Sequence, residues 1–285
     1  VGVVAATLVE RGFSGKRIAF ELDSHYLPVR RFQGFATAIP DATIVDFSRV
    51  IWELRLRKSR REIEYLRRAA RIADEAMRQA VAAVGEGISE RAAAIAASRV
   101  FFEQGADGGH IGRIASGSRT DSLHGALGDH PLALGEIIHM ELCPQVSGYS
   151  ARLMRPTVIG APPVEQTEAA RLMIEIQDRQ LAAMRPGVPA RDIDRIIREG
   201  MLAAGLRERY DNATGYTLGY YGTPYPARSS DFTRTFLPTS EWTLEAGMVF
   251  HVYTAARGMA FSESVLVTDD GHERLTCLER HLFER

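Results

Sequence analysis

The spacing of apolar residues predicts four amphipathic helices after residue 58. In each of four segments, apolar side chains recur every three or four residues, which is the period of a helix with one buried face. These segments are residues 59–84, 89–106, 163–187 and 189–206. Ser59 with Glu62 three residues later forms the pattern of a capping box, and Gly85 and Gly87 end the first helix.

Shorter apolar stretches between and after these helices predict β-strands. They lie at residues 110–117, 136–149, 151–160, 215–222, 248–258 and 259–271. The order is therefore helix, helix, strands, and then the same again. The stretch AVGEGIS at 83–89 also resembles AMRPGVP at 183–189. This predicts an internal duplication, with two α+β halves facing each other across a cleft that could hold a site.

The first 52 residues predict a different arrangement, in which helices and strands alternate. Gly12 ends the first helix and Pro40 stops the second. The expected elements are a helix over 1–12, a strand over 16–22, a helix over 26–40 and a strand over 42–47. We interpret this as the end of an α/β domain without a glycine-rich phosphate loop, and we place the domain boundary in the basic segment 52–62.

Composition narrows the class of protein. Hydrophobic residues make up 45% and charged residues 25% of the 285 residues, which is typical of a globular protein with a full core. A net charge of -1 and a pI near 6.8 do not favour binding to nucleic acid or to an anionic membrane surface. Cys143 and Cys277 form neither a metal-binding pattern nor a disulfide framework. No apolar run approaches 18 residues, so we expect a cytoplasmic protein without a membrane span.

The start of the chain predicts a missing segment. The apolar residues 1–10 lack the basic region and the cleavage site of a signal peptide, and the chain begins with Val rather than Met. We therefore expect an earlier part of the protein to precede residue 1.

Several blocks of the sequence resemble the creatinase, prolidase and methionine aminopeptidase family. They occur in the family's order and are SGSRTDSLHG, LGEIIHMEL, SGYSARLMRPTVIG, LEAGMVFHVY and SESVLVTDDGHERLT. The resemblance implies an α+β fold of the pita-bread type over residues 53–285, with two pseudo-symmetric halves. It also implies that residues 1–52 are the C-terminal part of a creatinase-type N-terminal domain. In metal-free relatives that domain helps to close the active site of the other subunit, so the resemblance implies a homodimer.

The resemblance also implies where two metal ions would bind in metal-dependent members. Those members use two Asp, one His and two Glu residues, and the matching positions here are Glu141, Arg152, Tyr216, Tyr253 and Glu263. Two carboxylates, two phenols and a guanidinium do not supply the ligands that a two-metal site needs. We therefore expect no cofactor, with two divalent metal ions as the alternative. Arg152 would place a fixed positive charge beside Glu141.

Other residues in the matched blocks are candidates for catalysis without a metal. Histidine suits general acid–base work near neutral pH, and His124 stands where metal-free relatives use a histidine. Glu263 would bind an amidinium or guanidinium group through paired hydrogen bonds, and Glu141 would hold a second nitrogen or activate water. Tyr216, Tyr253, His251 and Arg152 would line the substrate pocket. We interpret His110, His130 and His139 as structural or solvated, and Cys143 as a small buried apolar residue.

Three functions follow from this interpretation. The first is a metal-independent hydrolase of a non-peptide C–N bond in a small amidine or guanidino compound, as in ectoine hydrolase or creatinase. Met154 stands where creatinase has a second glutamate, which favours the ectoine type. The alternatives are a metallopeptidase of the Xaa-Pro dipeptidase or aminopeptidase type, and an inactive binding module with the same fold.

Overall fold

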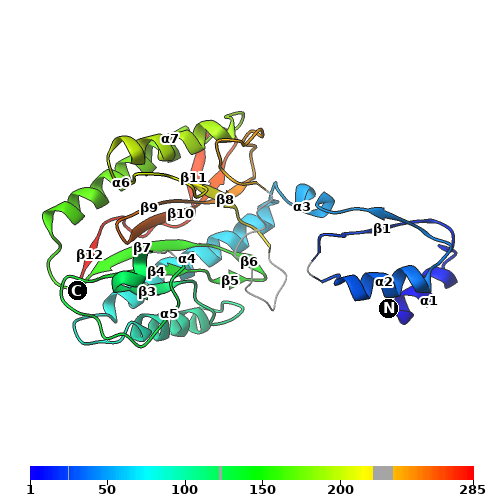
Figure 1. The fold of residues 1–285 in the computed structure, drawn as a ribbon, viewed down its shortest axis with the longest axis horizontal. Helices are drawn as coiled ribbons and strands as arrows, with labels where there is room; N and C mark the ends of the chain where they lie inside the picture. Colours follow the sequence, from blue (N-terminus) through cyan, green and yellow to red (C-terminus); the bar gives the residue numbers. More distant parts are fainter. Residues whose placement is uncertain (25, 122–123, 221–233) are drawn as a thin grey trace. The chain divides into compact units, whose positions relative to one another are not determined.

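The structure is a computed structural model that describes residues 1–24, 26–121, 124–220 and 234–285. It divides into two compact units, Val1–Arg55 and Leu56–Arg285 (Figure 1). This division lies three residues after the boundary expected from the sequence. Among the described residues, no helix is both long enough and apolar enough to cross a membrane.

The first unit is a small α/β arrangement. Strands β1 (Arg17–Phe20) and β2 (Thr43–Asp46) pair in parallel. Its helices are α1 (Gly2–Glu10), α2 (Val29–Ala38) and α3 (Val50–Leu54). Phe20 packs against two phenylalanines of α2, but Ala5 and Ile39 are the buried apolar residues among those described here. Many apolar side chains of this unit therefore stay exposed. The homodimer implied by the resemblance stays a prediction.

The second unit consists of two halves, each with a helical pair and a four-stranded sheet. The first half has α4 (Arg60–Ala82), α5 (Arg91–Glu103), β3 (Ile114–Ser116), the 3-10 turn η1 (Gly117–Asp121), β4 (Ile137–Leu142) and β7 (Leu153–Val158). The short strands β5 (Gln145–Val146) and β6 (Tyr149–Ser150) pair as a hairpin between β4 and β7. β12 (Phe283–Glu284) joins the sheet, whose order is β12-β7-β4-β3.

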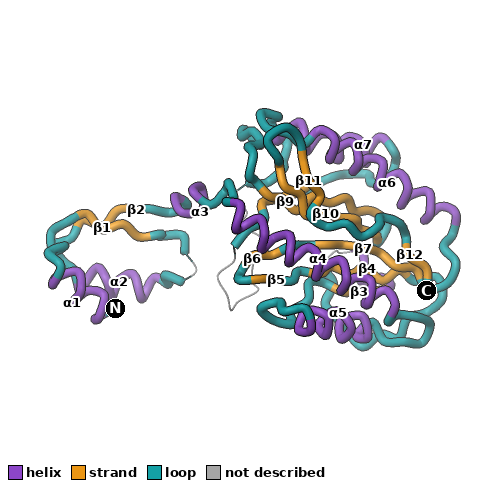
Figure 2. Tube along the Cα trace, turned by 180° about the vertical axis from the view of Figure 1, so that it is seen from behind, coloured by secondary structure: helices purple, strands orange, loops and turns teal. Residues whose placement is uncertain are grey.

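The second half repeats this arrangement. It has α6 (Val164–Ala183), α7 (Ala190–Ala203), β8 (Gly215–Thr217), β9 (Val249–Ala256), β10 (Met259–Val267) and β11 (His272–Arg274). Its sheet order is β11-β10-β9-β8. Figure 2 shows the two sheets between the helix pair α6–α7 on one side and α4–α5 on the other. This confirms the predicted α+β class with two pseudo-symmetric halves.

Matched backbone hydrogen bonds show the duplication in detail. Gly87 N donates to Leu132 O at 2.7 Å, and Gly187 N donates to Leu244 O at 2.8 Å. Both glycines have positive φ values, +73° and +84°, which other residues adopt only with strain. The two halves therefore turn from their first helix to their second in the same way.

The predicted capping box starts α4. Ser59 accepts a hydrogen bond from Glu62 N, and the Glu62 carboxylate accepts one from Ser59 N at 2.7 Å. These bonds satisfy backbone donors that a helix leaves unpaired at its first turn.

The two sheets meet where β7 lies against β10. Ser262 Oγ accepts a hydrogen bond from Met154 N at 2.7 Å, and Ser264 Oγ accepts one from Arg152 N at 2.9 Å. Because these serines point from β10 towards β7, the inner faces of the two sheets face each other at this contact. The candidate site lies on these inner faces.

Candidate functional site

Strand alternation separates an inner face from a helix-covered face in each sheet. In β4, Ile138, Met140 and Leu142 belong to the core formed with α4 and α5. The alternate residues His139 and Glu141 must therefore point to the inner face. In the second sheet, Val252 of β9 packs in the core with α7, so its neighbours His251 and Tyr253 point to the inner face.

A buried ion pair forms the centre of the inner face. Arg152 donates from Nε and Nη2 to the Oε1 atom of Glu141, and both side chains are buried. The Cys143 thiol contacts the same oxygen at 3.6 Å, so this residue is more than an apolar filler. Burial alone lowers the pKa of Arg152, but Glu141, Cys143 and Tyr216 together outweigh burial and raise that pKa above its usual value. The guanidinium is therefore charged at any physiological pH.

One oxygen of this pair is available for a ligand. Glu141 Oε2 is buried and has no hydrogen-bond partner within the described part of the chain. An unsatisfied buried acceptor is costly, about 1–3 kcal/mol, so such an atom points to a bound group or water.

Aromatic side chains of the second sheet lie against the ion pair. The Arg152 guanidinium carbon is 5.4 Å from the ring centroid of Tyr216. The ring centroids of Tyr216 and His251 are 5.1 Å apart, and those of His251 and Tyr253 are 5.3 Å apart. Met154 joins Tyr216 and Tyr253 in one buried cluster that bridges the two sheets. The structure thus brings together Glu141, Arg152, Tyr216, Tyr253 and His251, as the sequence predicted.

Burial sets the protonation of these groups. It raises the pKa of Tyr216 well above its usual value, and it does the same for Tyr253, so both phenols keep their protons at neutral pH. Burial lowers the pKa of His251 well below its usual value, so this imidazole is neutral. The inner face therefore offers neutral hydrogen-bonding groups around the Glu141–Arg152 ion pair.

His139 is a functional candidate that sequence reasoning missed. It is buried on the inner face, two residues before Glu141, and neither of its ring nitrogens has a hydrogen-bond partner within the described residues. Burial lowers its pKa to about 4, and the charges of Glu141, Arg152 and His124 also act on it. His139 and Glu141 are two residues apart on β4, so strand alternation places both side chains on the same face. This spacing was the sequence signal for His139. His124 itself lies at an exposed position in the turn after η1.

The low pKa of His139 predicts a loss of stability in mild acid. In the unfolded chain this histidine binds a proton near pH 6.5, but in the folded chain only near pH 4. The unfolded state therefore binds more protons between these values, and stability falls as the pH decreases through this range. We expect a total loss of about 3 kcal/mol from this residue. Urea unfolding of wild type and His139→Gln at several pH values measures it, and an equal pH slope in both proteins would contradict the assignment.

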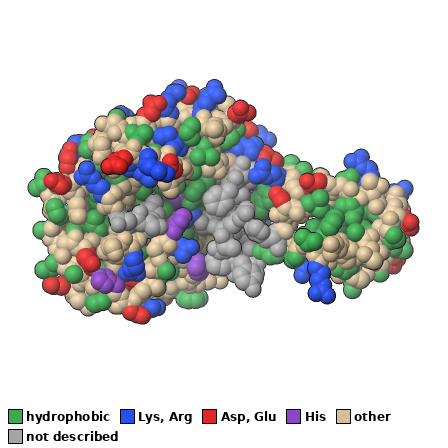
Figure 3. Space-filling model, in the orientation of Figure 1, with side chains coloured by type: hydrophobic (Ala, Val, Ile, Leu, Met, Phe, Trp, Pro, Cys, Tyr) green, Lys and Arg blue, Asp and Glu red, His purple; other side chains and the backbone are tan. Residues whose placement is uncertain are grey.

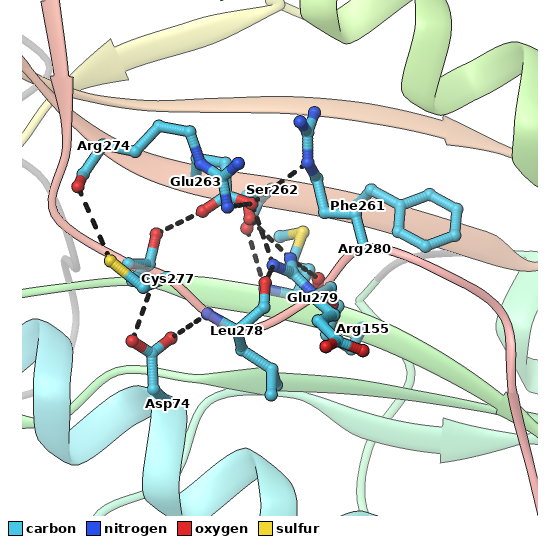
Figure 4. Close-up of polar contacts among 12 residues, drawn as sticks. Asp74, Arg155, Phe261, Ser262, Glu263, Arg274, Cys277, Leu278, Glu279 and Arg280 are labelled. Atoms are coloured by element: carbon cyan, nitrogen blue, oxygen red, sulfur yellow. Dashed lines mark hydrogen bonds and ion pairs between the residues drawn. The ribbon is translucent and has the colours of Figure 1, made fainter.

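Glu263 is not brought together with these residues. Directly opposite Glu263 on β9 is Val252, a residue of the helix-covered face. Its carboxylate accepts a hydrogen bond from Arg155 Nη2 at 2.8 Å and another from Thr276 Oγ1. Arg274 and Arg280 lie 3.4 Å and 3.5 Å from the same carboxylate (Figure 4). Glu263 thus holds the C-terminal segment in place, and we do not propose a catalytic role for it.

Ser262 occupies the inner-face position that the sequence assigned to Glu263. It pairs directly with Tyr253 across the two strands, and opposite residues in an antiparallel pair point to the same face. The stretch FSES places polar residues at three successive positions, 262, 263 and 264. Matching Glu263, rather than Ser262, to the family's last ligand was therefore wrong by one residue. Because neighbouring residues of a strand point to opposite faces, this error placed Glu263 on the inner face.

The inner-face residues do not fit a two-metal centre. Such a centre needs several carboxylate or imidazole ligands converging on the ions. Here a guanidinium occupies an oxygen of Glu141, two protonated phenols lie on the same face, and Ser262 rather than Glu263 points to it. Within the described residues, no group of three His, Cys, Asp or Glu side chains could hold a metal ion.

Comparison with known proteins places the chain in a family. Residues 64–269 match the family described as metallopeptidase family M24. A Xaa-Pro dipeptidase of Pyrococcus furiosus is 30% identical over 236 residues, which is 82% of this chain and 67% of the relative. An uncharacterized peptidase of Bacillus subtilis is 27% identical over 272 residues, which is 95% of this chain and 76% of the relative.

Solved structures show the same fold. A Xaa-Pro dipeptidase from Bacillus anthracis aligns with a TM-score of 0.88 at 24% identity, over 100% of this chain and 78% of that one. An X-Pro aminopeptidase from Thermotoga maritima aligns with a TM-score of 0.86 at 23% identity, over 100% of this chain and 79% of that one. The fold is therefore the pita-bread hydrolase fold. The chain belongs to metallopeptidase family M24.

Family membership corrects one prediction. We expected no cofactor, but the family consists of metallopeptidases, and its prolidases and Xaa-Pro peptidases are dinuclear metalloenzymes. The expectation of no cofactor is therefore wrong. Because the described side chains do not match the ligand set, we assign no reaction step to a metal ion. The comparisons do not identify a creatinase or an ectoine hydrolase among the relatives described above.

Proposed function

We propose that this protein hydrolyses the C–N bond of a small amide, with Xaa-Pro dipeptides as the first substrate class to test. The observation that carries the proposal is the buried carboxylate of Glu141, which keeps one oxygen available on an inner face lined by neutral imidazoles and phenols. The relatives named Xaa-Pro dipeptidase support the substrate class.

Glu141 and His124 would move the protons. Glu141 Oε2 can accept a hydrogen bond from the attacking water, while Arg152 holds Oε1 and fixes the orientation of the carboxylate. Breaking a C–N bond requires a proton on the leaving nitrogen, and we assign the donation of that proton to His124.

Tyr216 and Tyr253 would stabilise the negative charge that develops on the substrate oxygen. Burial raises the pKa of both phenols, so their hydroxyl groups remain hydrogen-bond donors at neutral pH. Donors fixed in a site that excludes water are among the largest contributions to amide hydrolysis. His139 and His251 can hold the polar ends of the substrate through their ring nitrogens, which have no hydrogen-bond partner in the part of the chain that the structure describes.

A hydrolysis screen tests this function. We expect release of free proline from Xaa-Pro dipeptides, measured with and without added divalent cations, and a fall in kcat of about 100- to 10,000-fold in His124→Ala. His130→Ala is a matched control, because His130 is paired with Glu136 on the surface. No release of proline by wild type under any of these conditions would contradict the proposal.

One observation favours a second candidate, the hydrolysis of a small amidine or guanidino compound. Glu141 already binds a guanidinium, that of Arg152, against the ring of Tyr216. A substrate with the same group could take this position if Arg152 moved aside. Including ectoine, hydroxyectoine and creatine in the screen separates the two candidates. Thermal stabilisation by a compound that is not turned over would favour a binding module.

A further inference from the structure

The fully buried carboxylate of Glu90 binds the loop that follows His124. Glu90, at the start of α5, is completely buried and uses both of its oxygens. Ser116 Oγ donates to Oε2 at 2.7 Å, and Gly128 N donates to Oε1. Arg119 donates from Nη1 to Oε1 at 2.8 Å and from Nη2 to Oε2 at 2.6 Å. One side chain thus joins β3, η1 and the loop that follows His124.

Arg119 extends this connection to the backbone next to His124. Its Nη1 atom also donates to Ala126 O at 2.9 Å, so the guanidinium bridges Glu90 and the loop. Together, Glu90 and Arg119 hold two backbone groups, Ala126 O and Gly128 N, within four residues of His124.

Close packing fixes the residue that follows His124. A Cβ atom added at Gly125 would lie 2.6 Å from the Cβ of Ala115 on β3 and 2.8 Å from Arg119 O. Both distances are below the limit that real contacts show, so the backbone of Gly125 lies directly on this strand. The position of His124 is therefore defined from its C-terminal side by packing and by hydrogen bonds.

The pair stays ionised under physiological conditions. Burial alone raises the pKa of Glu90, but the hydrogen bonds from Arg119, Ser116 and Gly128 outweigh burial and lower that pKa below its usual value. A buried ion pair is costly to assemble and gives little net stability, whereas it can specify one conformation. The conformation specified here is that of the described residues 116–121 and 124–128.

We propose that Glu90 and Arg119 are positioning residues that hold His124 in place for hydrolysis. This inference rests on the proposed function. Neither residue belongs to the inner face. Both would act through the loop, because a displacement of about 1 Å in a catalytic group can lower the rate by about 100-fold.

The test uses two variants and two independent measurements. Arg119→Lys keeps the positive charge but loses the planar fork that reaches both Glu90 oxygens and Ala126 O. Ser116→Ala removes the hydrogen bond from Ser116 Oγ to Glu90 and the one that Ser116 Oγ accepts from Arg119 Nη2 at 3.2 Å, but it keeps the Glu90–Arg119 pair. For Arg119→Lys we expect a fall in kcat of about 100-fold with little change in KM. We also expect faster amide hydrogen exchange in residues 124–128 and a changed rate of modification of His124 by diethylpyrocarbonate. Ser116→Ala should give smaller changes in the same direction.

Arg91→Lys is the matched control. Arg91 is the next residue after Glu90, but it pairs with Asp129 at the surface and should leave both measurements unchanged. Unchanged exchange and modification in Arg119→Lys would overturn the inference, and so would faster exchange with an unchanged kcat. If wild type hydrolysed no substrate, the proposed function would fail, while exchange and His124 modification would still decide whether this pair orders the loop.

Discussion

Replacing Arg152 with methionine is expected to lower the free energy of unfolding by about 3–5 kcal/mol, because the Glu141 carboxylate then stays buried without its charged partner. Glu141 and Arg152 are both buried, and each is the other's ion-pair partner on the inner face. Urea unfolding measures the change.

A double variant separates the ion pair from the packing. Arg152→Met with Glu141→Leu removes both charges and fills a similar volume, so most of the lost stability should return. Arg171→Met is a control at an exposed arginine, which pairs with Glu168 and Glu175, and should cost about 0–1 kcal/mol. Equal losses in the single and double variants would show that packing, rather than the unpaired charge, is responsible.

Replacing Glu263 with glutamine is the second change with a large expected effect. Glu263 is fully buried and meets Arg155, Arg274 and Arg280 within 3.5 Å. A neutral amide leaves the buried Arg155 guanidinium without a charged partner, so we expect a loss of about 3–5 kcal/mol. The C-terminal segment 274–280 should also exchange its amide hydrogens faster, because the lost interactions hold it against β10. Thermal unfolding and hydrogen exchange measure both effects.

Glu273→Gln is the control for this variant. Glu273 pairs with Arg67 near the surface, where both side chains are partly exposed, so the same substitution should cost about 0–1 kcal/mol. A loss in Glu263→Gln as small as that in Glu273→Gln would contradict the structural role given to Glu263.

Much of the fold could be predicted from local patterns. The helix expected over 59–84 is observed over Arg60–Ala82, with both hydrogen bonds of its capping box. The two similar turns, at Gly87 and Gly187, correctly indicated the duplication, because a positive φ demands glycine at both places. These features depend on residues that are neighbours in the sequence, so periodicity and capping describe them well.

The candidate site could be predicted only in part. Glu141, Tyr216 and Tyr253 lie on strands whose order the family blocks determine, and Arg152 stands directly before β7. The four residues do meet. Glu263 does not meet them, because a shift of one residue along a strand moves a side chain to the other face.

Two further residues were not singled out as functional candidates from the sequence. His139 stands in an apolar strand, where a single histidine is most simply interpreted as structural. Glu90 stands at a helix start, where a carboxylate is expected for reasons of local charge. The role of His139 depends on its burial near the charge of Glu141, and that of Glu90 on its hydrogen bonds with Arg119. Only the folded chain provides these surroundings.

One measurement tests most directly whether the inner face is the active site. It compares the turnover of a Xaa-Pro dipeptide by Glu141→Gln and by Glu263→Gln, each at a temperature where the variant is folded. We predict that Glu141→Gln loses nearly all activity per folded molecule, whereas Glu263→Gln loses far less. Substantial activity in Glu141→Gln together with an inactive, folded Glu263→Gln would contradict this assignment.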